Sequence, residues 1–524
     1  MSDRKRLVGA VATMLLACGW STGSLADERF PAEEAGIAEV HAAMRAGDIT
    51  ARSLVEHYLR RIEAYDKRGP AINAIITLNP RALERADELD RRFAEAGLTG
   101  PLHGIPVIVK DNYDTADMPT SAGSLSLKDS IPPDDAWQVR KLRAAGAIII
   151  AKSNMYEFAF SPFETVGSRL PGHTRNPYAL NRVPAGSSGG TAASIAAGFA
   201  VVGLGTDTGN SIRGPSSHNA LVGIRSTLGL TSRDGIVPLY LDHDVGGPMA
   251  RNVADAALVL DVIAGYDPAD PVTEAARDRA RDSYVSHLDP NGLRGARIGV
   301  LRQLSNRKGA DPEVLQRFSR ALDDLRAAGA TVIDPLALAE LDGLVPPVEG
   351  EQLTVWCPRF RYDLEAYLAA LGERAPVRTL EAIIASGQYH PQLEADLRYF
   401  QEQAPPADNE TCAQAELGRA RLRDAVRALL AEHNLDALAY PTWSNPPRLI
   451  GDLNTPHGDN SQHVSPHTGF PAITVPMGYV QDGLPVGLQF VGDAFSEGRL
   501  IALAYAYEQS TRHRRSPPSA PPLD

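Results

Sequence analysis

The 524-residue sequence has few cysteines, no surplus of basic residues and no long hydrophobic run. Three cysteines are too few for a disulfide-based scaffold. Fifty-two Lys and Arg stand against 64 Asp and Glu, and the net charge of −12 disfavours nucleic acid as a partner, because phosphate binding needs a basic face. No run is long enough to span a bilayer. The 43% hydrophobic share is nevertheless ample for a packed core.

The first 26 residues have the layout of a secretory signal peptide. A charged start precedes an apolar run at 7–20 and a small-x-small end at 24–26. We expect cleavage after Ala26 and a periplasmic or secreted mature protein. Two alternatives stay open: an N-terminal helix of a cytosolic protein, and a lipid anchor on Cys18, since residues 15–18 resemble a lipobox. Export would leave Cys357 and Cys412, whose pairing the sequence leaves undecided.

Alternating strands and helices predict an α/β layered fold. Wholly apolar runs at 105–109, 147–151 and 199–204 are typical of buried strands, and 34–66 has helical periodicity with Thr50 as an N-cap. Further helices are expected at 80–96, 137–145, 191–197, 254–263 and 497–509, and further strands at 296–301, 435–439, 472–476 and 486–491.

The domain organisation follows from the same patterns. Residues 27–515 are interpreted as a single domain, in which 335–430 is a helical insertion over the active site, because long excursions of this kind are often lids. Residues 516–524 are rich in proline and are expected to form a loose tail.

Glycine and small hydroxyl residues cluster between 184 and 217. Residues 185–190 read Ala-Gly-Ser-Ser-Gly-Gly, and 205–213 read Gly-Thr-Asp-Thr-Gly-Asn-Ser-Ile-Arg. Such residues let main-chain amides approach a ligand closely. A serine in such a loop can be a nucleophile whose oxyanion is bound by neighbouring N–H groups, although an ordinary Gly/Ser turn would look the same in isolation.

Lys110 is the candidate base. It follows the apolar run 105–109 and precedes Asp111 and Asn112. Burial disfavours an ammonium group, lowers its pKa and makes a neutral amine available. The alternative, a lysine that reaches solvent from a strand end, is common. Because Lys110 occurs together with the serine-rich motif at 185–190, we favour its interpretation as a general base.

Together these motifs resemble the amidase signature family. The stretches 186–190 and 205–213 are similar to its signature, 110–112 to its catalytic lysine motif, and the 24-position step from Ser187 to Ser211 equals the spacing of its two catalytic serines. Similarity to the family continues at 247–251, 469–472 and 483–487. Taken as a whole, the sequence most resembles exported bacterial peptide amidases and their relatives. The resemblance implies an α/β/α sandwich with a large central mixed β-sheet covered by helices on both faces.

The resemblance also implies roles for the catalytic residues. Ser211 would be the nucleophile, Ser187 the bridging serine that a cis peptide precedes in the family, and Lys110 the base. The expected reaction converts an amide and water to an acid and ammonia or an amine through an acyl-enzyme, without a metal or another cofactor.

The loop before Ser211 would supply the remaining parts of the site. Main-chain amides of Thr208, Gly209 and Asn210 are expected to form the oxyanion hole together with that of Ser211. An ion pair between Asp207 and Arg213 would brace this loop.

Two positions depart from the family pattern. Asn210 and Ala185 stand where glycine is usual. We expect a positive φ at Asn210, since Asn tolerates that conformation best among non-glycine residues, and its amide could donate into the pocket. Ala185 should be harmless unless its backbone needs a positive φ.

Other functions compete with amide hydrolysis. A carbamate or ester hydrolase of the same fold stays open. An α/β-hydrolase with Ser188 as nucleophile would need a histidine, and a non-catalytic binding homologue would not need the intact Lys110, Ser187 and Ser211. An export signal argues against the tRNA-dependent amidotransferase subunit that shares the fold. A metal pair at His463 and His467 lacks a third ligand.

The substrate is expected to be a small-molecule or peptide amide, bound by a monomer or homodimer. Loops at 156–174 and 335–430 should line its pocket. Six aromatic residues are candidates for the lining, about half of which we expect to be core: Phe158, Phe160, Phe163, Trp356, Phe360 and Trp443.

Overall fold

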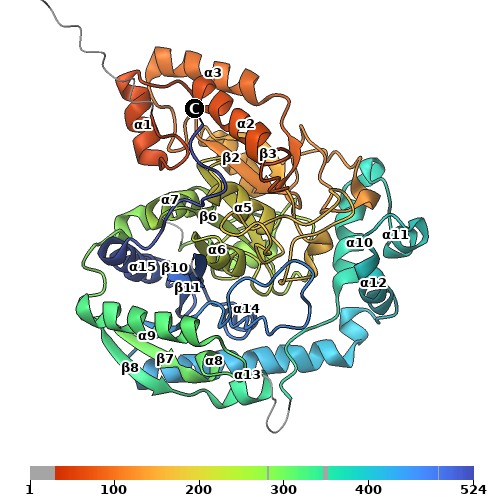
Figure 1. Cartoon of the computed structure of the whole chain (residues 1–524). Coiled ribbons are helices and arrows are strands. Elements are labelled where there is room, and N and C mark those ends of the chain that lie inside the picture. Colours follow the sequence, from red (N-terminus) through yellow and green to blue (C-terminus); the bar gives the residue numbers. More distant parts are fainter. Residues whose placement is uncertain (1–29, 280–282, 346–351, 482, 524) are drawn as a thin grey trace, which may run out of the picture. The chain divides into compact units, whose positions relative to one another are not determined.

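A mixed β-sheet of 11 strands dominates the described part of the chain (Figure 1). Its strand order is β1-β3-β2-β4-β6-β5-β10-β11-β9-β7-β8. The pairs β2–β3, β2–β4, β7–β8 and β7–β9 are parallel, and the other pairs are antiparallel. The strands are β1 (Ile75–Leu78), β2 (Pro106–Lys110), β3 (Ile148–Ser153), β4 (Val202–Asp207), β5 (Val222–Arg225), β6 (Val245–Ala250), β7 (Arg297–Leu301), β8 (Thr331–Leu336), β9 (Ala437–Pro441), β10 (Ala472–Val480) and β11 (Leu484–Val491).

This computed structural model describes residues 30–279, 283–345, 352–481 and 483–523. The expected signal peptide, with Cys18, lies outside these ranges. Residues Pro31–Asp524 form one structural unit. Within the described ranges, no helix is long and apolar enough to cross a membrane.

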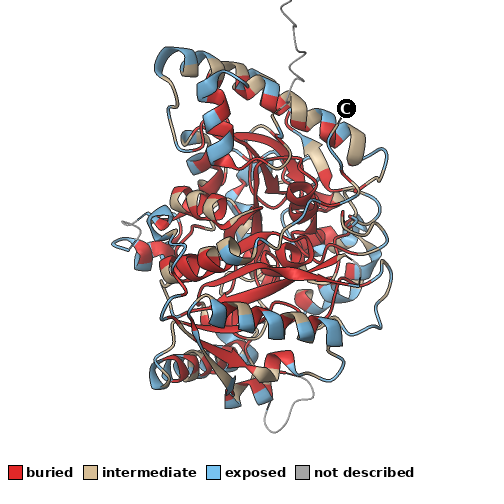
Figure 2. Cartoon of the chain, turned by 60° about the vertical axis from the view of Figure 1, so that its left-hand side comes forward, coloured by how far each residue is buried: buried red, intermediate tan, exposed pale blue. Residues whose placement is uncertain are grey.

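Helices cover the sheet and exclude water from its strands. In the centre of the molecule α5 and α6 contact each other and the middle strands, while α4, α7, α15 and α9 form a second contacting series. Every residue of β2 to β6 and of β9 to β11 is buried (Figure 2), as expected for strands covered on both faces. The helices are α4 (Trp137–Ala144), α5 (Gly189–Ala196), α6 (Arg213–His218), α7 (Val253–Ile263), α9 (Pro312–Ala327) and α15 (Glu497–Thr511). The expected α/β sandwich is confirmed.

The N-terminal helical region consists of separate helices. The chain turns at Gly47, whose φ is +81°, and Thr50 caps the next helix by accepting a hydrogen bond from the main-chain amide of Ser53. The helices are α1 (Ile37–Ala46), α2 (Ala51–Tyr65) and α3 (Ala82–Ala96). The expected N-cap at Thr50 is therefore confirmed.

About half of 335–430 is α-helical, and a disulfide crosses this region. The helices are α10 (Phe360–Ala370), α11 (Leu380–Ser386), α12 (Glu394–Gln401) and α13 (Glu410–Glu432), and α10 to α12 share an apolar cluster with residues 155–166. Cys357, just before α10, is bonded to Cys412 in the first turn of α13. The pairing that the sequence left open is thus present, and it joins the two ends of the α10–α12 segment.

The C-terminal tail is not loose, contrary to expectation. Arg61 of α2 is 1% exposed, and its guanidinium donates to the carbonyl oxygens of Ala520 and Pro521, each at 2.8 Å. The same side chain also donates to the carbonyl oxygens of Ala197 and Gly198 at 2.8 and 2.9 Å. One buried cation therefore ties the tail to α2 and to the turn after α5, which proline content alone did not indicate.

We predict that Arg61→Met lowers the free energy of unfolding by about 3 kcal/mol or more, because buried carbonyl groups lose a charged donor. Urea denaturation of the purified protein measures this change. Arg60→Met is the matched control, since Arg60 is exposed on the same helix, and it should change stability by less than about 0.5 kcal/mol. Equal effects of the two substitutions would contradict the role given to Arg61.

Candidate active site

Lys110 and Ser187 lie in direct contact at the C-terminal end of β2. Lys110 is the last residue of β2, which pairs in parallel with β4. Its Nζ lies 2.7 Å from Ser187 Oγ and 2.8 Å from Thr206 Oγ1, and the lysine is completely buried. A neutral amine can donate to Thr206 and still accept the proton of Ser187.

Burial lowers the pKa of Lys110 to about 7. The cause is desolvation, which disfavours the ammonium form, and the negative charges of Asp207 and Asp244 oppose it only in part. An amine with this pKa is a substantial fraction neutral at physiological pH. Lys110 therefore has the property that a general base requires.

Close packing of the backbone fixes the loop that carries Ser187. The Gly186–Ser187 peptide is cis, as the resemblance implied. A Cβ on Gly186 would lie 2.0 Å from the carbonyl oxygen of Glu164, and one on Gly190 would lie 2.2 Å from that of Asn154. Ala185 has a φ of +62°, so the left-handed conformation expected at Asn210 occurs at Ala185 instead.

A buried ion cluster braces the loop between β4 and α6. Asp207 Oδ2 accepts from Arg213 Nε at 3.0 Å, and its Oδ1 accepts from Arg225 at 3.1 Å. Burial by itself would raise the pKa of Asp207, but the two guanidinium groups outweigh it and lower the pKa to about 2. Arg213 also donates to the carbonyl oxygen of Gly209 at 2.7 Å. The expected Asp207–Arg213 pair is present.

Residues 208–211 lie between β4 and α6, and we call them the oxyanion loop after the role that the resemblance predicts for them. In the described part of the chain, no protein acceptor is paired with the main-chain amides of Gly209, Asn210 and Ser211, so these amides are available to a ligand. Thr208 Oγ1 donates to Asp244 at 2.6 Å. Ser211 is 5% exposed and borders a pocket.

Asn210 differs from the sequence-based expectation in two ways. Its φ is not positive, so the physical reason given for tolerating Asn there is wrong. Its side chain is 1% exposed, and its Nδ2 donates to Asp459 Oδ2 at 2.7 Å rather than into the pocket. The side-chain amide thus connects the oxyanion loop to a distant segment of the chain.

The pocket at Ser211 has a volume of about 240 Å³, and aromatic and aliphatic side chains form much of its wall. Of the six aromatic candidates, Phe160 and Trp356 line it. Phe158 and Phe360 belong to an apolar core cluster. Further lining residues are Ala159, Pro162, Leu239, Tyr240 and Gln462. Apolar side chains and the polar groups of the 208–211 loop thus meet next to Ser211.

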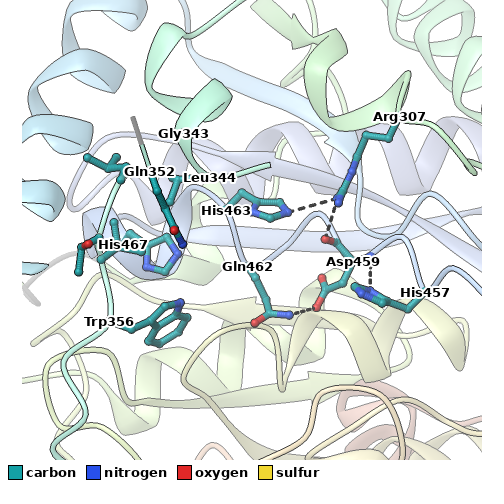
Figure 3. Close-up of a pocket in the computed structure, with 13 residues that line it drawn as sticks. Arg307, Gly343, Leu344, Gln352, Trp356, His457, Asp459, Gln462, His463 and His467 are labelled. Atoms are coloured by element: carbon teal, nitrogen blue, oxygen red, sulfur yellow. Dashed lines mark hydrogen bonds between the residues drawn. The ribbon is translucent and has the colours of Figure 1, made fainter. Parts of the chain in front are cut away.

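A second, larger pocket of about 410 Å³ shares Trp356 and Gln462 with the first (Figure 3). Its lining carries ionisable side chains, including Arg307 and three histidines. His463 Nε2 lies 3.2 Å from Arg307, whereas His467 Nδ1 lies 3.2 Å from His243 Nε2. The two histidines of the candidate metal pair therefore have different partners, and the described residues contain no cluster of three potential metal ligands.

Ser188 is engaged by the main chain of β4. Its Oγ donates to the carbonyl oxygen of Thr206 at 3.1 Å and accepts from the amide of Thr206 at 3.3 Å. It is completely buried. This geometry argues against Ser188 as the nucleophile of an α/β-hydrolase.

Several residues of the site were not assigned a role from the sequence. Thr206 accepts hydrogen bonds from both Lys110 and Asn112, and thereby orients the lysine. Arg225, Asp244 and Asp459 support the loop from other elements. Thr206 lies inside the glycine-rich motif and Asn112 inside the lysine motif, and membership of these motifs was the only feature of the sequence that pointed to them. No feature of the sequence pointed to Arg225, Asp244 or Asp459.

The sequence matches the family model for Amidase over residues 53–501. The chain belongs to the amidase family. The crystal structure of a peptide amidase from Stenotrophomonas maltophilia is 42% identical with a TM-score of 0.84, over 93% of this chain and 99% of that one. A probable amidase from Arabidopsis thaliana is 34% identical over 96% of this chain and 95% of its own length. A glutamyl-tRNA(Gln) amidotransferase chain from Acinetobacter baumannii is 34% identical over 91% of this chain and 96% of its own length.

We predict that the reactivity of Ser211, the candidate nucleophile of this amidase-family protein, rises with pH through about 7. The base is active when neutral, and Lys110 becomes neutral as the pH passes its pKa of about 7. The rate constant for covalent labelling by a fluorophosphonate, measured from pH 5 to 9, tests this. Lys110→Met should label slowly and without the inflection, and a labelling rate constant that still rises steeply at pH 9 in the wild type, with no inflection near 7, would refute the lowered pKa.

Proposed function

We propose that the protein hydrolyses carboxylic amides through an acyl-enzyme, with a catalytic triad of Ser211, Ser187 and Lys110. The observation that carries the proposal is the 2.7 Å contact between Lys110 Nζ and Ser187 Oγ in a fully buried environment. A lysine with a pKa of about 7 next to a serine hydroxyl is suited to exchange a proton with it.

In the proposed first step, Lys110 takes the proton of Ser187 as Ser187 takes that of Ser211. The freed Ser211 Oγ attacks the carbonyl carbon of the amide, and the main-chain amides of the oxyanion loop stabilise the negative charge on its oxygen. The C–N bond then breaks as Ser187 gives its proton to the leaving nitrogen and regains one from the Lys110 ammonium, so that Lys110 is neutral again. In the second half, water adds to the ester carbon while Ser187 takes its proton and Lys110 takes that of Ser187. The bond to Ser211 Oγ then breaks, the relay returns the proton to that oxygen, and the acid is released.

The two pockets suggest the class of amide. The aromatic and aliphatic side chains at Ser211 favour an aryl, alkyl or amino-acid side chain, and the pocket beyond Trp356 favours an extended, hydrogen-bonding substituent. Similarity to a peptide amidase supports peptide amides, with aryl and alkyl amides as simpler substrates. Carbamates and esters carry the same carbonyl group and could react by the same steps, so they are the alternative.

We predict that Ser211→Ala abolishes turnover and fluorophosphonate labelling, and that Lys110→Ala and Ser187→Ala each reduce turnover by at least about 1,000-fold. The double variant Lys110→Ala/Ser187→Ala should be little worse than either single variant, because the two residues act as one relay. Hydrolysis of a panel of peptide amides, aryl acylamides, aliphatic amides, carbamates and esters measures these effects and ranks the substrates.

Ser188→Ala serves as the control for this series. It removes an adjacent serine hydroxyl that the main chain of Thr206 already engages, and it should retain labelling. Labelling of Ser188 in the wild type, located by peptide mass spectrometry, would instead support the α/β-hydrolase alternative.

We also propose that the protein is exported. The sequence-based signal peptide motivates this, and the Cys357–Cys412 disulfide supports it, because disulfides persist mainly in oxidising compartments.

Cleavage after Ala26 is the expected result when intact mass is measured on protein from the periplasm of the producing cells. The two cysteines should then be two hydrogens lighter than their reduced form. A mature chain that starts at a lipidated Cys18 would replace this proposal with the lipoprotein alternative, and full-length cytoplasmic protein would end it.

A further inference from the structure

The side chain of Asn210 makes a contact that a glycine could not make. Asn210 belongs to the oxyanion loop, and its Nδ2 donates to Asp459 Oδ2 at 2.7 Å. The two residues are 249 positions apart in the sequence, and each is 1% exposed. The contact therefore joins the reactive loop, inside the protein, to the segment between β9 and the short helix α14 (Ser465–Thr468).

Asp459 is held firmly on its own segment. Its Oδ1 accepts from the amide and the hydroxyl of Ser461 at 3.0 and 2.6 Å, and its Oδ2 also accepts from Gln462 Nε2 at 2.8 Å (Figure 3). Its main-chain oxygen accepts from Arg307, and its amide donates to His457 Nδ1. A carboxylate fixed on so many sides can act as an anchor.

The oxyanion loop is thus held from two sides. Arg213 holds the carbonyl oxygen of Gly209 at 2.7 Å and is itself bound to Asp207. The Asn210–Asp459 contact holds the next residue, so both holds lie within the three residues, 209–211, whose amides must converge on one oxygen. A displacement of about 1 Å in such a group can cost about 100-fold in rate.

Packing over the loop strengthens the same connection. Gln462 donates to Asp459 and also covers Gly209, where a Cβ would lie 3.1 Å from Gln462 Oε1. Asp459 and Gln462 therefore contact two successive residues of the loop. Neither side chain needs to touch the substrate carbonyl for this effect.

We propose that Asp459 is a positioning residue for the reaction, which sets the oxyanion loop by holding the side-chain amide of Asn210. This inference rests on the proposed function, because it concerns the amides that would bind the oxyanion. It also explains the role of Asn210 at a position where glycine is usual. The hydrogen bond from its side chain to Asp459, which we call the tether, restrains a loop that glycine would leave more flexible.

A double-mutant cycle with Asp459→Ala and Asn210→Ala tests the proposal. Each single variant removes the tether and should lower kcat and the fluorophosphonate labelling rate constant by about 10- to 100-fold. Because Asp459 also lines the larger pocket, KM is measured with a small amide that does not reach this pocket, and it should change by less than about threefold. The double variant should be no more than about threefold worse than the poorer single variant, because both substitutions break one contact. A role for Asp459 in the fold of its segment alone would raise KM and would persist when Asn210 is already alanine.

Matched controls keep the outcomes distinct. Asp452→Ala removes a carboxylate of the same segment that accepts from main-chain amides at 454 and 455, and it should leave kcat unchanged. If Asp459→Ala does not fold, Asp459→Asn keeps the size of the side chain and should show the same lack of additivity with a smaller loss. Losses that multiply in the double variant, or no loss from either Asp459 variant, overturn the proposal.

Failure of the proposed function has a different signature. In that case the wild-type protein hydrolyses none of the amides in the panel, or the fluorophosphonate modifies a residue other than Ser211. If Ser211 is labelled normally but the losses of kcat from Asp459→Ala and Asn210→Ala multiply in the double variant, only the role proposed for Asp459 is wrong.

Discussion

The architecture of the candidate active site depends on the buried ion pairs of the Asp207 carboxylate. This carboxylate stands at the end of β4, and its two oxygens bind Arg213 at the start of α6 and Arg225 at the end of β5. Three elements thus meet at one charge that has no access to water. Removing one partner of such a cluster leaves an unpaired buried charge, which typically costs several kcal/mol. The loop that carries Ser211 therefore has one conformation that satisfies the cluster.

Burial has the opposite outcome at Lys110, where it prevails over the neighbouring charges. Like Asp207, this lysine is completely buried, but within the described chain no carboxylate lies in ion-pair contact with it, and its partners are the hydroxyl groups of Ser187 and Thr206. Its charge is therefore compensated only in part, and burial lowers its pKa, whereas the arginines outweigh burial at Asp207. An ionised carboxylate and a candidate base with a lowered pKa can both be buried at this site because their immediate partners differ.

Much of the fold could be predicted from apolar runs, whereas the loop geometry could not. The runs at 105–109 and 147–151 became β2 and β3, but β6 was not predicted because Gly246 and Gly247 interrupt its apolar pattern. A Cβ on Gly247 would lie 2.4 Å from the carbonyl oxygen of Ile224, so the neighbouring strand requires that glycine. The positive φ at Ala185 and the role of Thr206 depend on segments that meet only in the folded chain. Motifs pointed to the candidate residues, of which Lys110 and Ser187 lie in contact, and packing decided how they are held.

The wall shared by the two pockets has a consequence for chemical probes. Trp356 and Gln462 border both the 240 Å³ space at Ser211 and the 410 Å³ space beyond it. Trp356 stacks on His243 at 4.4 Å, and the adjacent Cys357 is bonded to α13, so this wall has little freedom to yield. An inhibitor with a short tail would use only the smaller space. A tail that passes between the tryptophan and the glutamine would reach polar groups found beyond them, so tail length is the variable through which selective inhibitors of this protein can be designed.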